Sequence, residues 1–174
     1  MPVKHQFLPL LLLALYISFG CKKSDPSRID VSQITHTDIN GNLTSTADNS
    51  DWTSDASWSD AETALFVTPP AEQLTNTESG TITLSAGYPN PLATQQLIYV
   101  KSSAKAVMEL VVTDNMLSIK KRDFINVSVN GYAVSSFYDP AIFSDSVNYR
   151  VYYGFYSQAN GLFYKGHGDI RISR

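Results

Sequence analysis

The chain has 174 residues, of which 13 are basic and 16 acidic, so its formal net charge at pH 7 is −3. This length suits one domain with a sizeable core. The negative balance argues against a nucleic-acid partner, because nucleic-acid-binding domains present a basic surface to the phosphates.

Residues 1–20 have the pattern of a secretory signal. Lys4 precedes an apolar run from Phe7 to Gly20. The run is too short to span a bilayer, but it has the length of the apolar core of a signal peptide. It ends at Cys21, the only cysteine in the chain, so no disulfide is expected. We therefore predict that residues 1–20 are removed.

The residues around Cys21 resemble a bacterial lipobox, in which the cysteine is acylated and becomes the mature N-terminus. Gly20 supplies the small residue before the cysteine, whereas Ser18 and Phe19 depart from the usual form. Lys22–Asp25 resembles the start of many mature lipoproteins of Bacteroidota. The resemblance implies lipidation of Cys21 and a location in the cell envelope, at the outer membrane. Acyl chains hold a protein to a bilayer without any spanning helix.

The sequence divides the mature chain into three parts. Residues 21–50 are rich in Ser, Thr, Asn and Asp and are predicted to form a polar tether. Residues 51–80 form an acidic segment that contains both tryptophans, Trp52 and Trp58. Within it, Ser59 and Glu62 have the spacing of a capping box, which predicts one short helix.

Residues 81–174 carry the pattern of an all-β fold. Short apolar or alternating runs follow one another without a helical period. Asn130-Gly131 is the strongest signal for a hairpin turn. We predict an antiparallel immunoglobulin-like sandwich. Its expected strands are Thr81–Ser85, Gln96–Lys101, Ala106–Thr113, Leu117–Arg122, Phe124–Val129, Tyr132–Tyr138, Tyr149–Ser157, Leu162–Lys165 and Asp169–Ser173.

Part of this region resembles a second family. Tyr88-Pro89-Asn90-Pro91, the alternating stretch 97–100 and Val111–Asp114 resemble the opening of the C-terminal sorting domains of type IX secretion cargo in Bacteroidota. Those domains are small β-sandwiches. The resemblance implies a sandwich over residues 86–174 and, as an alternative function, a cargo protein that carries a cleavable sorting domain.

The strand at Tyr149–Ser157 supplies the candidate ligand surface. By the period of two, Tyr149, Val151, Tyr153 and Phe155 share one face, and Arg150, Tyr152 and Tyr156 share the other. We assign the first face to the core and the second to solvent. Arg150, Tyr152 and Tyr156 then form a candidate surface for a glycan or a protein partner. The alternative is that outward tyrosines simply suit a strand.

Other candidate sites have simpler explanations. Six oxygen-bearing residues fall at the positions of a calcium-binding loop, but Ala56 replaces the glycine that the loop needs. The six residues at these calcium-loop positions are Asp51, Thr53, Asp55, Ser57, Ser59 and Glu62.

The two tryptophans, Trp52 and Trp58, suit either a sugar-stacking platform or the edge of the core, and we favour the core.

No catalytic constellation is evident in the sequence. His167, between two glycines, is expected in a tight turn, and no nucleophile or metal-ligand pattern accompanies it. We predict no catalytic residues, no metal and no cofactor. The expected function is that of a non-catalytic, lipid-anchored binding or structural module of the outer membrane.

Overall fold

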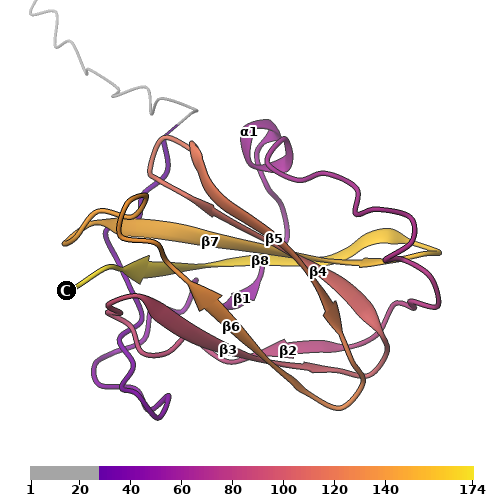
Figure 1. Cartoon of the computed structure of the whole chain (residues 1–174), viewed down its shortest axis with the longest axis horizontal. Helices are drawn as coiled ribbons and strands as arrows, with labels where there is room; N and C mark the ends of the chain where they lie inside the picture. Colours follow the sequence, from indigo (N-terminus) through magenta and orange to yellow (C-terminus); the bar gives the residue numbers. More distant parts are fainter. Residues whose placement is uncertain (1–27) are drawn as a thin grey trace, which may run out of the picture.

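The computed structural model describes residues 28–174, which form two antiparallel sheets packed face to face (Figure 1). The signal at residues 1–20 and Cys21 lie outside the described residues. One sheet has five strands in the order β1-β8-β7-β4-β5, and the other has three in the order β2-β3-β6. The all-β, antiparallel prediction is confirmed. The bounds are β1 Thr53–Ser54, β2 Ile82–Leu84, β3 Gln95–Ser102, β4 Ala106–Thr113, β5 Ile119–Val127, β6 Tyr132–Phe137, β7 Asn148–Ser157 and β8 Gly161–Arg171.

The main core lies between the two sheets. Val151, Tyr153 and Phe155 of β7 face it, and Ile98 and Val100 of β3 approach from the other sheet. These positions follow the period of two that a strand imposes on its side chains. Full burial of each large apolar side chain stabilises the fold by roughly 1.5–3 kcal/mol.

Strand β4 is buried along its whole length. Its apolar residues run without alternation, which is typical of a strand that is covered on both faces. Leu110 and Val112 join the main core, whereas Val111 belongs to a second apolar cluster with Leu65 and Tyr152. The second cluster lies between the five-stranded sheet and the part of the chain that precedes the sandwich.

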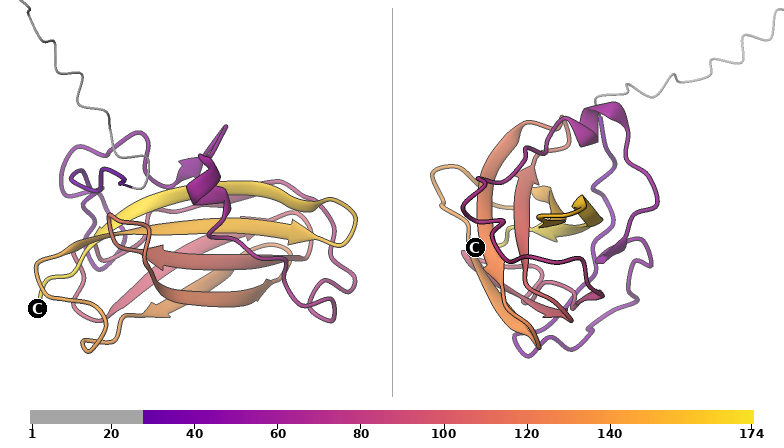
Figure 2. Two further views of the ribbon diagram at one scale, coloured as in Figure 1. Left: turned by 90° about the horizontal axis from the view of Figure 1, so that it is seen from above. Right: turned by 90° about the vertical axis from the view of Figure 1, so that its right-hand side faces the viewer.

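Residues 28–50 differ from the polar tether that the sequence predicts for residues 21–50. Ile34, Thr35 and Thr37 are buried, and Thr37 exchanges two backbone hydrogen bonds with Asn90, at 2.8 and 3.1 Å. Figure 2 shows this segment running along one side of the sandwich. The tether prediction is wrong for this stretch, because its polar groups pair with the sandwich and do not depend on an apolar core of their own.

The described residues contain one helix, α1 (Asp60–Thr63). Its N-terminus has both bonds of a capping box: Glu62 N donates to Ser59 Oγ at 3.2 Å, and Ser59 N donates to Glu62 Oε2 at 2.9 Å. No helix within residues 28–174 is long and apolar enough to cross a membrane.

Three predicted turns differ from the structure. The sequence predicts two strands in residues 117–129, where the structure has the single strand β5. It also predicts two strands in residues 162–173, where the structure has mainly the single strand β8. His167, which the sequence predicts in a tight turn, therefore lies within a strand. Asn130 and Gly131 have positive φ values of 78° and 130°, but they connect strands of different sheets and form no hairpin.

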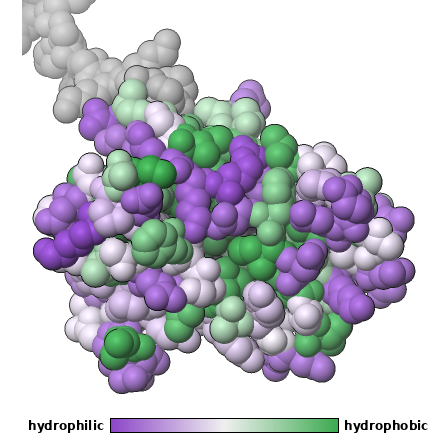
Figure 3. Space-filling model, viewed as in Figure 1, coloured by the Kyte–Doolittle hydropathy of each residue, from purple (hydrophilic) through white to green (hydrophobic). Residues whose placement is uncertain are grey.

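Strands β5 and β6 are edge strands of different sheets and are not paired with each other. Hydrophobic surface gathers near the centre of Figure 3, in the area where β4, β5 and β6 lie in Figure 1.

Lys121 of β5 connects the two sheets, because its ammonium donates to Ser136 Oγ and to the Phe137 carbonyl, both at 2.9 Å. Charged side chains along β5, such as Lys120 and Arg122, disfavour pairing with a further strand.

Candidate functional site

The predicted ligand surface on β7 is buried. Tyr152 is 0% exposed and Tyr156 is 6% exposed. The Arg150 side chain is 13% exposed. The prediction that these residues face solvent is wrong, because residues 28–67 lie over this side of the five-stranded sheet. We call it the covered face. The opposite set on β7, Tyr149, Tyr153 and Phe155, is buried in the main core.

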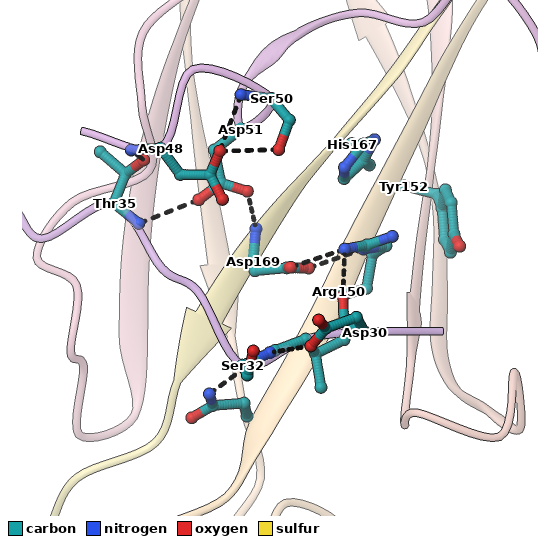
Figure 4. Close-up of polar contacts among 12 residues, drawn as sticks. Asp30, Ser32, Thr35, Asp48, Ser50, Asp51, Arg150, Tyr152, His167 and Asp169 are labelled. Carbon is teal, nitrogen blue, oxygen red and sulfur yellow. Dashed lines mark hydrogen bonds and ion pairs between the residues drawn. The ribbon is translucent and has the colours of Figure 1, made fainter. Parts of the chain in front are cut away.

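Arg150 holds the preceding chain to the covered face (Figure 4). Its Nε and Nη2 atoms donate to the two carboxylate oxygens of Asp169, both at 2.7 Å. Nη2 also donates to the Asp30 carbonyl at 2.6 Å. A bidentate pair of this kind fixes the guanidinium in one orientation. Nε and Nη2 are therefore occupied within the fold, and the side chain is mostly buried.

Asp51 joins the N-terminal segment to β8. Its carboxylate accepts from Thr35 N and from Asp169 N, both at 2.9 Å (Figure 4). The residue is 6% exposed. Burial, together with the nearby Asp169 carboxylate, raises the pKa of Asp51 to about 6. Burial also raises the pKa of Asp169, while Arg150 opposes that shift.

Both tryptophans hold the acidic segment against the sandwich, as the favoured interpretation of the sequence has it. Trp52 stacks on Tyr153 with ring centroids 6.2 Å apart. It lies so close to Gly168 that a Cβ there would be 2.3 Å from the Trp52 ring. Trp58 stacks on Phe66 at 4.5 Å and meets Tyr152 edge to face at 5.6 Å. Neither ring forms a free platform for a sugar.

The remaining polar groups of the covered face are also paired. Tyr152 donates to Glu62 at 2.8 Å, and Tyr156 donates to Glu109 at 2.9 Å. Glu109 is 0% exposed and forms an ion pair with Arg122. Burial raises the pKa of Glu109, and these partners oppose the shift. The carboxylates therefore serve as acceptors that fasten residues 59–67 to the sheet.

Three of the six residues at the calcium-loop positions have structural roles. Asp51 binds two backbone amides, Glu62 caps α1, and Asp55 accepts from Trp58 Nε1 at 2.6 Å. Asp55 also pairs with His167 Nδ1, at 2.8 Å. Within residues 28–174 no group of three or more His, Cys, Asp or Glu side chains is arranged to hold a metal ion.

Asn90 is a residue whose role the sequence does not reveal. It is 0% exposed. Its Nδ2 donates to the carbonyls of Thr35 and Asp169, both at 2.9 Å, and its Oδ1 accepts from Arg171 N at 3.0 Å. In the sequence Asn90 stands out only through its position between Pro89 and Pro91. That motif resembles the start of a sorting domain and does not indicate the hydrogen-bond partners of Asn90.

The outer face of the three-stranded sheet is open. Register pairs Gln95 with Phe137, Leu97 with Ser135 and Tyr99 with Ala133. We call these six residues the open face. Phe137 is 57% exposed and Tyr99 is 46% exposed. A hollow of about 330 Å³ adjoins this face, lined in part by Ile39, Tyr88, Gln95 and Leu97.

Comparison with known proteins adds no relative: no protein-family model matches the chain, and no curated protein matches it.

The burial of Asp51 predicts a specific pH dependence of stability. In the native protein the Asp51 carboxyl group has a pKa of about 6, whereas the ordinary pKa of an aspartate is 3.8. Between these values the native state holds more protons than the unfolded chain, so the contribution of Asp51 to the free energy of unfolding rises as the pH falls. From pH 7.5 to pH 5 the gain is about 1–2 kcal/mol.

Urea denaturation of the wild-type protein and of Asp51→Asn at both pH values measures this gain. We expect the variant to lose that part of the pH dependence. It should also be less stable, because one backbone N–H loses its acceptor. The exposed change Gln158→Asn serves as the control. Equal pH dependence in the wild-type protein and in Asp51→Asn would contradict the assignment.

Proposed function

We propose that the protein is a non-catalytic, lipid-anchored binding module of the bacterial cell envelope, held at the outer membrane through Cys21. We infer further that its sandwich is of the immunoglobulin-like kind, for which two facing antiparallel sheets are the support. The main support for a binding role is the exposure of aromatic side chains on the open face. On the covered face Tyr152 and Tyr156 are buried, whereas the open face presents the exposed rings of Tyr99 and Phe137.

A protein partner fits the open face better than a glycan does. Aliphatic side chains accompany its two exposed rings: Leu97 lies between Gln95 and Tyr99 on β3, and Ile39, which is 76% exposed, lines the adjoining hollow. Exposed apolar groups that lie together often mark sites of protein association. Rings on a rigid strand also lose little conformational entropy on binding.

The integration of residues 28–77 into the sandwich supports retention of the C-terminal region over its loss as a sorting domain. β1 pairs with β8, and Asn90 and Asp169 hold residues 35–51 through buried hydrogen bonds. A cut near Gly87 would separate these partners. A sorting domain that is removed from its cargo is expected to fold without such bonds.

The anchor is tested with Cys21→Ala. We expect the variant to be lost from the outer-membrane fraction, because acylation requires the thiol. Wild-type protein, which carries the acyl chains, is expected in the outer-membrane fraction. Cell fractionation with immunodetection makes the measurement. Equal membrane association of the two proteins would overturn the anchor.

Retention of residues 86–174 is tested by the intact mass of the protein purified from its own cells. We expect the mass of a chain that runs from acylated Cys21 to Arg174. A product that ends near Gly87 would favour the cargo alternative. The measurement needs no variant and does not depend on the identity of a partner.

The open face is tested with a photo-crosslinking residue at position 99 in living cells. We expect a discrete protein adduct that is lost when Phe137→Ser is added. The melting temperature should stay within a few degrees, because exposed side chains contribute little to the core. The same crosslinker at Gln158, at the far end of β7, is the matched control. Absence of any adduct, with binding to isolated envelope polysaccharide, would replace the protein partner by a glycan.

A further inference from the structure

The N-terminal segment joins the sandwich at one particular turn. Ile29 N donates to the Asn115 carbonyl, in the β4–β5 turn, at 3.0 Å. Arg28 follows Cys21 by seven positions in the sequence. A fully extended chain spans at most about 3.5 Å per residue, so the start of the described chain lies within about 25 Å of the acylated sulfur. With the anchor in a bilayer, this turn is therefore close to the lipid.

The β4–β5 turn is rigid. Asp114 accepts from Met116 N at 2.9 Å and from Ser118 N at 3.0 Å, and Lys120 pairs with the same carboxylate at 2.9 Å. Leu117 has a positive φ of 59°, which is rare for a residue with a branched side chain. Backbone strain of this kind persists only where the surrounding contacts fix it.

The consequence of this geometry is that Met116 points into solvent. Leu117 turns inward and packs against the second apolar cluster, where Ile29 also packs. Met116 is left 49% exposed at the turn, and Ile119, the first residue of β5, is 44% exposed. Two apolar side chains thus project from the part of the sandwich where the described chain begins.

Other apolar side chains lie at the same end of the sandwich. Thr113 pairs with Arg150, so the β4–β5 turn and the start of β7 share one end. Ile142 and Val147, in the β6–β7 loop, are 50% and 38% exposed. We call the β4–β5 turn (residues 114–118), Ile119 and the β6–β7 loop (residues 138–147) the anchor end; in Figure 1 it lies on the left, with the C-terminus.

We propose that the anchor end faces the membrane and that Met116 and Ile119 enter the lipid interface. This inference rests on the acyl anchor at Cys21 that is part of the proposed function. The reach of the chain supplies proximity, and the rigid turn supplies an apolar contact. Such a contact adds to the free energy of membrane association by the apolar area that it buries. The sandwich is then held upright, with its far end away from the lipid.

Charge does not provide this orientation. The described side chains near the anchor end include three basic and four acidic residues, and Lys120 is paired with Asp114, so this end has no basic excess. The contact should therefore depend little on salt, unlike adsorption of a basic patch to anionic lipid. The charged residues at this end are Arg28, Asp30, Asp114, Lys120, Asp139, Asp145 and Arg174.

The test uses the acylated full-length protein in vesicles of phosphatidylethanolamine and phosphatidylglycerol that contain a brominated phosphatidylcholine. An environment-sensitive fluorophore is attached to Met116→Cys, and the matched control carries it at Gln158→Cys. Acylated Cys21 has no free thiol and takes no label. β4 has eight residues, which at about 3.3 Å each place the control roughly 26 Å further from the lipid.

We expect lipid quenching at position 116 to exceed that at position 158 by about twofold or more, because bromine quenches only fluorophores within the bilayer region. The difference should persist at high salt and fall in Met116→Cys protein that also carries Ile119→Asp. Equal, weak quenching at both positions would overturn the proposal and show a sandwich that tumbles freely on its tether.

Failure of the anchor has a different signature. Without acylation, Cys21 would take the label and the protein would not float with the vesicles in a density gradient. Floating protein with equal quenching therefore contradicts the orientation alone. Concentration-dependent quenching that is relieved by dilution of protein in the bilayer would instead assign the anchor end to contact between two copies of the chain.

Discussion

The structure depends on a small set of buried hydrogen bonds that fasten an N-terminal segment of low hydrophobicity to the sandwich. Asp51 accepts from two backbone amides, one in the segment and one in β8, and Asn90 reaches both of the same regions with its side-chain amide. Burying a carboxylate costs free energy. The cost is offset because removal of either side chain would leave several buried backbone groups unpaired, at about 1–3 kcal/mol each.

This fastening decides what each sheet can do. The segment that Asp51 and Asn90 hold in place covers the face of β7 that carries Arg150, Tyr152 and Tyr156, and it turns that face into a second core. No segment of the described chain covers the three-stranded sheet in this way, and Tyr99 and Phe137 stay exposed. The distribution of accessible aromatic surface is thus a result of which sheet the preceding chain crosses.

The sequence predicts the strands well and their partners poorly. Alternation and apolar runs locate β3, β4, β6 and β7 within a few residues, because side-chain periodicity is a local property. The Asn130-Gly131 turn has the expected backbone but joins different sheets, and pairing is a non-local property. Burial of Tyr152 depends on residues 28–67, and the composition of the first part of this stretch, up to residue 50, indicates a tether. The roles of Asn90 and Asp51 could not be predicted for the same reason. Their side chains bind backbone atoms of residues that are distant in the sequence.

The long separation between these partners has a consequence for how the chain acquires its structure. Asp51 and Asp169 are 118 residues apart, and among residues 28–174 the strand β1 pairs with β8 alone. Residues 28–67 therefore cannot settle until the last strand has been synthesised. Contacts of such high sequence separation form late and slow the folding of small domains. This segment, with its two tryptophans, must therefore stay unfolded until the C-terminal strand is available.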